Sequence, residues 1–113
     1  MKSKGAYFFY EDETKGPRIL LFIYMKKPNT KKYSMAMLDN YVDYPAEVDA
    51  KDIKKMLEGI PTRTPLYNVE DYTPEELHDE MKSKNKKISK FYSKNWFTKQ
   101  YQFIHHQFSL VEK

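Results

Sequence analysis

The first third of the chain consists of short apolar runs separated by polar turn segments. Residues 6–10, 18–27 and 33–38 are rich in aromatic and β-branched side chains, and Gly16-Pro17 and Pro28-Asn29-Thr30 lie between them. Runs of this kind, bounded by turn residues, predict β-strands. The middle run is apolar on both faces, which predicts a central strand covered on each side. The simplest arrangement is a three-stranded antiparallel meander.

Helical spacing replaces strand alternation in the middle of the chain. Apolar residues recur every three or four positions across residues 50–58, which predicts a short helix. Asp49 followed by Asp52 is typical of an acidic cap at a helix start, and Gly59 is typical of a helix end. The proline-containing residues 61–72 then predict an extended connector.

The strongest local signal is Thr73-Pro74-Glu75-Glu76, which combines an N-cap, a proline at the first helical position and a capping box. Residues 82–87 carry no apolar side chain, so the helix that starts here is either one long helix with a solvated middle or a broken one. A later apolar stripe has helical spacing and consists of Phe97, Tyr101, Ile104, Phe108 and Val111. Residues 101–110 also favour strand formation, so a last strand remains an alternative.

These elements predict an α+β fold in which a three-stranded antiparallel sheet is packed by a short helix and a long or broken C-terminal helix. A chain of 113 residues has the usual length of one domain. We expect a single domain over residues 1–113, with a meander at 6–44, a short helix at 45–60, a connector at 61–72 and a C-terminal helical segment at 73–111.

Composition excludes several classes of protein. The chain is 40% hydrophobic and 32% charged, which is too apolar for a disordered protein. Its longest apolar run is far shorter than the ~20 residues of a membrane span, so we expect no membrane partner. The absence of cysteine excludes disulfides and cysteine chemistry, and it fits a reducing, cytoplasmic location.

Charge is divided into three blocks along the chain. Residues 1–38 carry eight basic and three acidic side chains, residues 39–80 carry four and twelve, and residues 81–113 carry eight and one. The block charges of +5, −8 and +7 sum to the net charge of +4. Basic blocks can bind polyanions even when the net charge is modest.

The last basic block interleaves lysines with aromatic residues, which is typical of nucleic-acid binding. Lysines neutralise phosphates, and aromatic rings stack on unpaired bases. The candidate residues are Lys82, Lys84, Lys86, Lys87, Lys90, Lys94 and Lys99, with Phe91, Tyr92 and Trp96 as stacking rings and a second lysine cluster at Lys26, Lys27, Lys31 and Lys32. Lysine runs more often form a solvated helix face, and aromatics at helical spacing more often form core.

The chain has only two arginines, Arg18 and Arg63, and arginine is the usual reader of base edges. We therefore expect contacts mainly to the nucleic-acid backbone, with weak sequence preference. The expected function is that of a non-enzymatic nucleic-acid-binding accessory protein, for DNA or RNA. A homodimer remains open.

No catalytic motif or glycine-rich phosphate loop is recognisable, so no catalytic residue, cofactor or metal is expected. His105 and His106 are adjacent and cannot easily share one metal ion, and His78 has no histidine four residues away. The clustered carboxylates match no catalytic template, and helix capping already accounts for several of them.

The acidic middle block supports an alternative function, that of a small module or inhibitor that binds a host protein. Acidic blocks steer protein association, and tyrosine is enriched at interfaces. The candidate residues are Asp39, Tyr41, Asp43, Tyr44, Tyr67, Glu70, Asp71 and Tyr72. The small, cysteine-free, lysine- and tyrosine-rich composition is typical of an accessory protein of a virus or mobile element.

Overall fold

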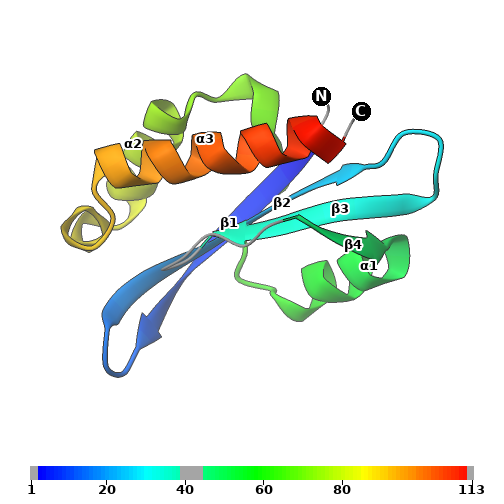
Figure 1. Ribbon diagram of the computed structural model, residues 1–113. Helices are drawn as coiled ribbons and strands as arrows, with labels where there is room; N and C mark the ends of the chain where they lie inside the picture. The colour runs from blue at the N-terminus through cyan, green and yellow to red at the C-terminus, as the bar shows by residue number, and fades with distance from the viewer. Residues whose placement is uncertain (1–2, 39–44, 112–113) are drawn as a thin grey trace.

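A five-stranded antiparallel sheet forms the centre of the computed structural model, which describes residues 3–38 and 45–111 (Figure 1). The strands β1 (Ser3–Asp12), β2 (Gly16–Lys26) and β3 (Lys32–Leu38) form the predicted meander. Two further strands, β4 (Ala46–Asp49) and β5 (Tyr67–Asn68), pair with the outer edges to give the order β4-β3-β2-β1-β5. The α+β class is confirmed, and the prediction of only three strands is wrong.

Both added strands are too short for alternation to reveal them. Strand β4 has four residues and β5 has two. Each forms because the chain returns to the open edge of a longer strand. There the backbone N–H and C=O groups of the short strand form hydrogen bonds with that edge instead of with water. Asn68 pairs with Lys4, which is 64 residues away in the sequence.

Strand β2 lies in the centre of the sheet, as its two apolar faces predict. Ile19, Leu21 and Ile23 contribute to the main core on one face, and Phe22 is fully buried on the other. Helices α2 (Pro74–Lys84) and α3 (Lys94–Val111) lie on the first side of the sheet, and α1 (Ala50–Gly59) lies on the opposite side (Figure 1).

Helix α1 begins where the acidic cap predicts. Asp49 is the N-cap, and its backbone N–H donates to the carboxylate of Asp52 at 3.2 Å. Ile53 is the buried residue of this helix. The helix ends at the predicted glycine: Gly59 is its last residue, one beyond the predicted range of 50–58, and Ile60 forms the C-cap.

The C-terminal segment is broken rather than continuous. Thr73 caps α2 through the predicted capping box with Glu76. A 3-10 turn, η2 (Lys86–Lys90), separates α2 from α3, and a similar turn, η1 (Val69–Asp71), precedes α2. Residues 101–110 are helical, so the alternative of a last strand is wrong.

The apolar stripe of α3 closes the main core. Phe97, Tyr101, Ile104 and Phe108 are at most 1% exposed, as their spacing predicts. They pack with residues from β1 to β3, α2 and η2. Full burial of each such side chain contributes about 1.5–3 kcal/mol. Within the described residues, no helix has the length and apolar character needed to cross a membrane.

Candidate functional site

The turn between α2 and α3 is set by one asparagine. Asn85 has an extended backbone, with φ −147°, so the α-helix ends there. Its side-chain oxygen then accepts a hydrogen bond from the backbone N–H of Lys87 at 3.1 Å and starts η2. This local capping makes the lysine-rich stretch a compact turn instead of a solvated helix.

Two buried side chains hold η2 onto the sheet. Ile88 is fully buried and Tyr92 is 2% exposed. The Tyr92 hydroxyl accepts from the backbone N–H of Ile19 at 3.4 Å, and its carbonyl oxygen lies 2.6 Å from Nε2 of the buried His78. The prediction that Tyr92 stacks on bases is corrected, because its ring is part of the core.

Phe91 is exposed, in contrast to the buried Ile88 and Tyr92. Its side chain is 45% exposed, and it lines a hollow of about 370 Å³ together with Lys90, Tyr92, Ser93 and Trp96. Trp96 is half-buried, packs partly on the core and lies 5.7 Å from Tyr92 between ring centroids. We call this feature the Phe91 hollow.

Arg18 and Gly16, which lie more than 70 residues earlier in the sequence, support the ring of Phe91. The guanidinium of Arg18 is 4.9 Å from the ring centroid, within the range of a cation–π interaction. Gly16 has φ +82°, and a Cβ atom there would lie 3.4 Å from the ring. Arg18 is one of only two arginines in the sequence, but no sequence pattern indicates that it contacts Phe91.

Most candidate lysines of the last basic block form no ion pair with the carboxylates that the structure describes. Lys84 lies 3.8 Å from Glu80, and Lys94 lies 2.8 Å from Asp79. The hydrogen bond from Lys94 lowers the pKa of the Asp79 carboxyl. Of the seven candidates, five are exposed and form no ion pair with a described carboxylate: Lys82, Lys86, Lys87, Lys90 and Lys99.

The second lysine cluster lies at the β2–β3 hairpin, at the far end of α3 from η2 (Figure 1). We call Lys26, Lys27, Lys31 and Lys32 the hairpin lysines. Lys27 binds Glu47 at 2.6 Å, and Lys32 forms an ion pair with Asp49. Hydrogen bonds from these lysines lower the pKa of both carboxyls. The fold therefore separates the two predicted clusters, and strand β4 neutralises part of the second.

The alternative acidic surface is described only in part. Asp39, Tyr41, Asp43 and Tyr44 lie outside the described residues. Tyr67, Glu70, Asp71 and Tyr72 lie in β5, in η1 and directly after η1. Tyr67 is half-buried and stacks edge-on against Tyr72, whereas Glu70 accepts a hydrogen bond from the backbone N–H of Ser3 at 2.8 Å.

The histidines do not combine into a metal site. Within residues 3–38 and 45–111, no three His, Asp or Glu side chains are grouped closely enough to bind a metal ion. His78 is buried against Tyr92, and burial lowers the pKa of His105. His106 is exposed on α3.

The geometry thus brings together one exposed aromatic ring, one supporting arginine and a turn of lysines that pair with no described carboxylate. Comparisons of the chain with protein-family models, curated proteins and solved structures found no match.

Proposed function

We propose that this protein is a non-enzymatic binder of single-stranded nucleic acid that uses the Phe91 hollow and the lysines of η2. The observation that carries the proposal is the exposed ring of Phe91, which shares its hollow with Lys90 and directly follows the turn that carries Lys86 and Lys87. None of these three lysines pairs with a described carboxylate. An exposed aromatic ring and a group of uncompensated cations are the two parts that a single-strand site requires.

The lysines supply attraction to phosphates. Each phosphate contact releases counterions, so affinity falls steeply as salt rises. A lysine already paired with a carboxylate releases fewer counterions, because its charge is partly compensated. Two of the four hairpin lysines are paired in this way, whereas none of the η2 lysines pairs with a described carboxylate, which favours the η2 lysines as the phosphate-binding group.

The Phe91 ring supplies the stacking surface. One base stacked on an aromatic ring contributes about 1–3 kcal/mol, whatever the identity of the base. Arg18 lies against this ring and stabilises it through the cation–π contact, which fixes the ring before binding. Bases of a duplex are already stacked, so the ring favours single strands.

The acidic β1–β2 turn indicates from which side the nucleic-acid strand reaches the Phe91 hollow. Glu11, Asp12 and Glu13 precede Gly16, where an added Cβ atom would lie 3.4 Å from the Phe91 ring. Their charge disfavours phosphates on that side. The strand is therefore expected to enter over η2 and α3.

Fluorescence anisotropy with labelled single- and double-stranded oligonucleotides at several salt concentrations tests this proposal. The variant Lys87→Glu with Lys90→Glu is expected to weaken single-strand binding roughly tenfold or more. The slope of log affinity against log salt should become shallower by ~0.7 for each phosphate that the variant no longer neutralises. The control Lys26→Glu with Lys31→Glu changes the net charge by the same amount at the hairpin and is expected to have a much smaller effect.

Two results would contradict the proposal. One is the absence of binding to any oligonucleotide at low salt. The other is an equal reduction of affinity in both double variants, because affinity would then depend on total charge and not on the η2 site.

A further inference from the structure

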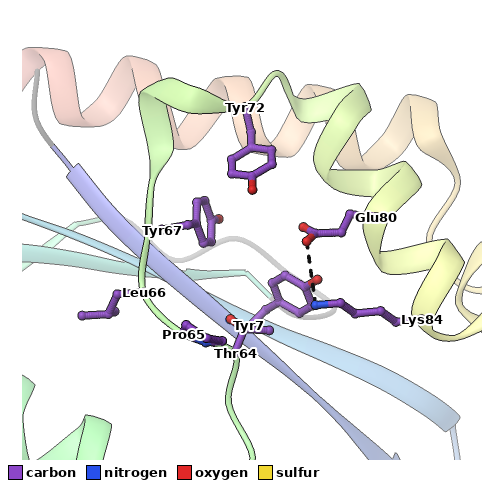
Figure 2. Close-up of a pocket in the computed structure, with 8 residues that line it drawn as sticks. All are labelled: Tyr7, Thr64, Pro65, Leu66, Tyr67, Tyr72, Glu80 and Lys84. Atoms are coloured by element: carbon purple, nitrogen blue, oxygen red, sulfur yellow. Dashed lines mark hydrogen bonds and ion pairs between the residues drawn. The ribbon is translucent and has the colours of Figure 1, made fainter.

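A second pocket lies between β1, the segment before β5 and helix α2 (Figure 2). Its volume is about 220 Å³, below the roughly 300–1,000 Å³ of pockets that bury a drug-sized ligand. The walls are formed by the rings of Tyr7, Tyr67 and Tyr72, by residues 64–66 and by the pair Glu80 and Lys84. We call it the tyrosine pocket, and its size suits a single ring system.

The rings of Tyr67 and Tyr72 form a fixed aromatic corner. Their centroids are 5.4 Å apart at an angle of 88°, and the Tyr67 hydroxyl lies 3.4 Å from that of Tyr101. A Cβ atom at position 5 would lie 2.8 Å from the Tyr67 ring, so Gly5 allows this ring to lie against β1. The segment 64–66 is held to β1 by the bond from Thr64 N–H to the carbonyl of Tyr7 at 2.9 Å.

Tyr7 links the pocket to its charged pair. Its side chain is 1% exposed, and its hydroxyl interacts with the side chains of Lys84 and Glu80, although it forms no hydrogen bond of normal geometry with a described residue. The Lys84 ammonium lies over the same ring, 5.1 Å from the centroid (Figure 2). Burial raises the pKa of Tyr7, so the hydroxyl stays protonated at neutral pH.

Glu80 and Lys84 place an acceptor next to a donor. Their charged atoms are 3.8 Å apart, longer than a hydrogen bond, and both side chains remain about two-fifths exposed at 39% and 43%. Each therefore keeps capacity for a ligand. The carboxylate accepts two hydrogen bonds from neighbouring N–H groups, and the ammonium donates to a carbonyl oxygen.

We propose that the tyrosine pocket binds one unpaired guanine of the bound strand, an inference that rests on the proposed function. The Watson–Crick edge of guanine presents O6, N1–H and the N2 amino group in a row. The N1–H and N2–H groups suit Glu80, and O6 suits Lys84. The other bases can make fewer of these bonds, because adenine and cytosine offer one amino group and thymine offers one N–H.

The register of the sheet places Tyr7, which lines the pocket, close along the sheet to the residue that contacts Tyr92 in the Phe91 hollow. Tyr7 pairs with Leu21, two residues along β2 from Ile19, and Ile19 donates to Tyr92 beneath the hollow. Two residues correspond to roughly 7 Å along a strand. A strand that spans both sites would stack on Phe91 and present one base to the tyrosine pocket.

The test compares a labelled oligothymidylate with the same strand carrying one central guanine, adenine, cytosine or inosine. The guanine strand is expected to bind roughly tenfold more tightly than oligothymidylate, which lies within the usual range of discrimination by a well-placed base contact. Inosine lacks the N2 amino group, so its gain should be smaller. This comparison uses only the wild-type protein and does not depend on the folding of a variant.

Two variants then assign the preference to the pocket. Glu80→Gln is expected to abolish the guanine gain, measured as the ratio of the affinities for the guanine strand and for oligothymidylate, and Tyr7→Phe, which removes the hydroxyl that contacts Glu80 and Lys84, should reduce this ratio. Glu75→Gln is the matched control, because it removes the same charge from an exposed position of α2 outside the pocket.

The outcomes separate the two proposals. Equal binding of all strands, or a preference for another base, overturns the guanine site and leaves the proposed function standing. A guanine gain that survives in Glu80→Gln also overturns the assignment to this pocket. No binding of any strand overturns the proposed function and the guanine site with it.

Discussion

The two ends of the molecule carry similar numbers of lysines in different surroundings. At the hairpin, the carboxylates of Glu47 and Asp49 in β4 pair with Lys27 and Lys32. At η2, the lysines pair with no described carboxylate and lie beside an exposed ring. The number of basic residues in a sequence segment is therefore a poor measure of the charge that the surface offers to a partner.

The two ends also differ in how they are held. The hairpin projects from the sheet, and its turn is closed by bonds among Lys27, Thr30 and Lys32. The turn at η2 is fixed to the core by Ile88 and Tyr92. A binding site on a fixed turn loses less conformational entropy when a ligand binds. The comparison thus favours η2 as the functional end.

The anchor beneath η2 gives the largest expected effect. Replacing Ile88 with alanine leaves a cavity, so the free energy of unfolding should fall by about 2–5 kcal/mol. Thr30→Ala at the hairpin removes only exposed hydrogen bonds and should cost less than about 1.5 kcal/mol. Urea unfolding followed by circular dichroism measures both variants. A small effect of Ile88→Ala would show that η2 is not anchored as the structure indicates.

The exposed ring of Phe91 should matter for binding more than for stability. Phe91→Ala is expected to weaken single-strand binding by about 1–3 kcal/mol, because one stacking surface is removed. Its effect on unfolding should be small, since the side chain is 45% exposed. Phe91→Leu is the control, because it keeps an apolar side chain but not the flat face. If the leucine variant binds like wild type in fluorescence anisotropy, stacking is not the source of affinity.

The ion pairs of the hairpin are expected to have the smallest effect on stability, and this effect can be measured as a dependence of stability on pH. Pairing with Lys27 and Lys32 lowers the pKa of Glu47 and Asp49 from ordinary values of 4.5 and 3.8. A lowered pKa contributes stability above the ordinary value, and that stability is lost as pH falls through the lowered pKa. Wild type should therefore lose stability in acid below about pH 4.5.

The control for this pH dependence is Glu47→Gln with Asp49→Asn, in which asparagine retains a side chain suited to the N-cap. The urea midpoint of this double variant should fall less than that of wild type when the pH is lowered from neutral to below the ordinary pKa values of the Glu47 and Asp49 carboxyls. Equal slopes for the two proteins would mean that the hairpin pairs do not contribute to stability. Both ion pairs are well exposed to solvent, so the difference should be small.

The local signals in the sequence predicted the main elements correctly. The capping box at Thr73, the two apolar faces of β2 and the stripe from Phe97 to Phe108 all lie where their patterns place them. Each of these signals arises from neighbours within a few residues, so periodicity and capping chemistry are sufficient to detect it. Strands β4 and β5 gave no such signal, because they depend on distant partners.

The candidate site was predictable only in part, for the same reason. The lysines and aromatics of residues 82–99 were identified, but their sequence does not show that Tyr92 is buried while Phe91 is exposed. Where a 3-10 turn docks on a sheet, adjacent side chains point to the core and to solvent, and only the docking decides which is which. The tyrosine pocket combines residues of β1, the segment before β5 and α2, so no local pattern indicates it.

The sequence alone determined the α+β class, the order of the main elements and the division of charge into blocks, because these depend on local spacing and composition. Tertiary structure decided which lysines pair with described carboxylates, since β4 brings Glu47 and Asp49 to the hairpin and not to η2. It also decided that Arg18 and Gly16 support Phe91 across more than 70 residues. Contacts between distant segments cost chain entropy that only the packed core offsets, so no short stretch of sequence encodes them.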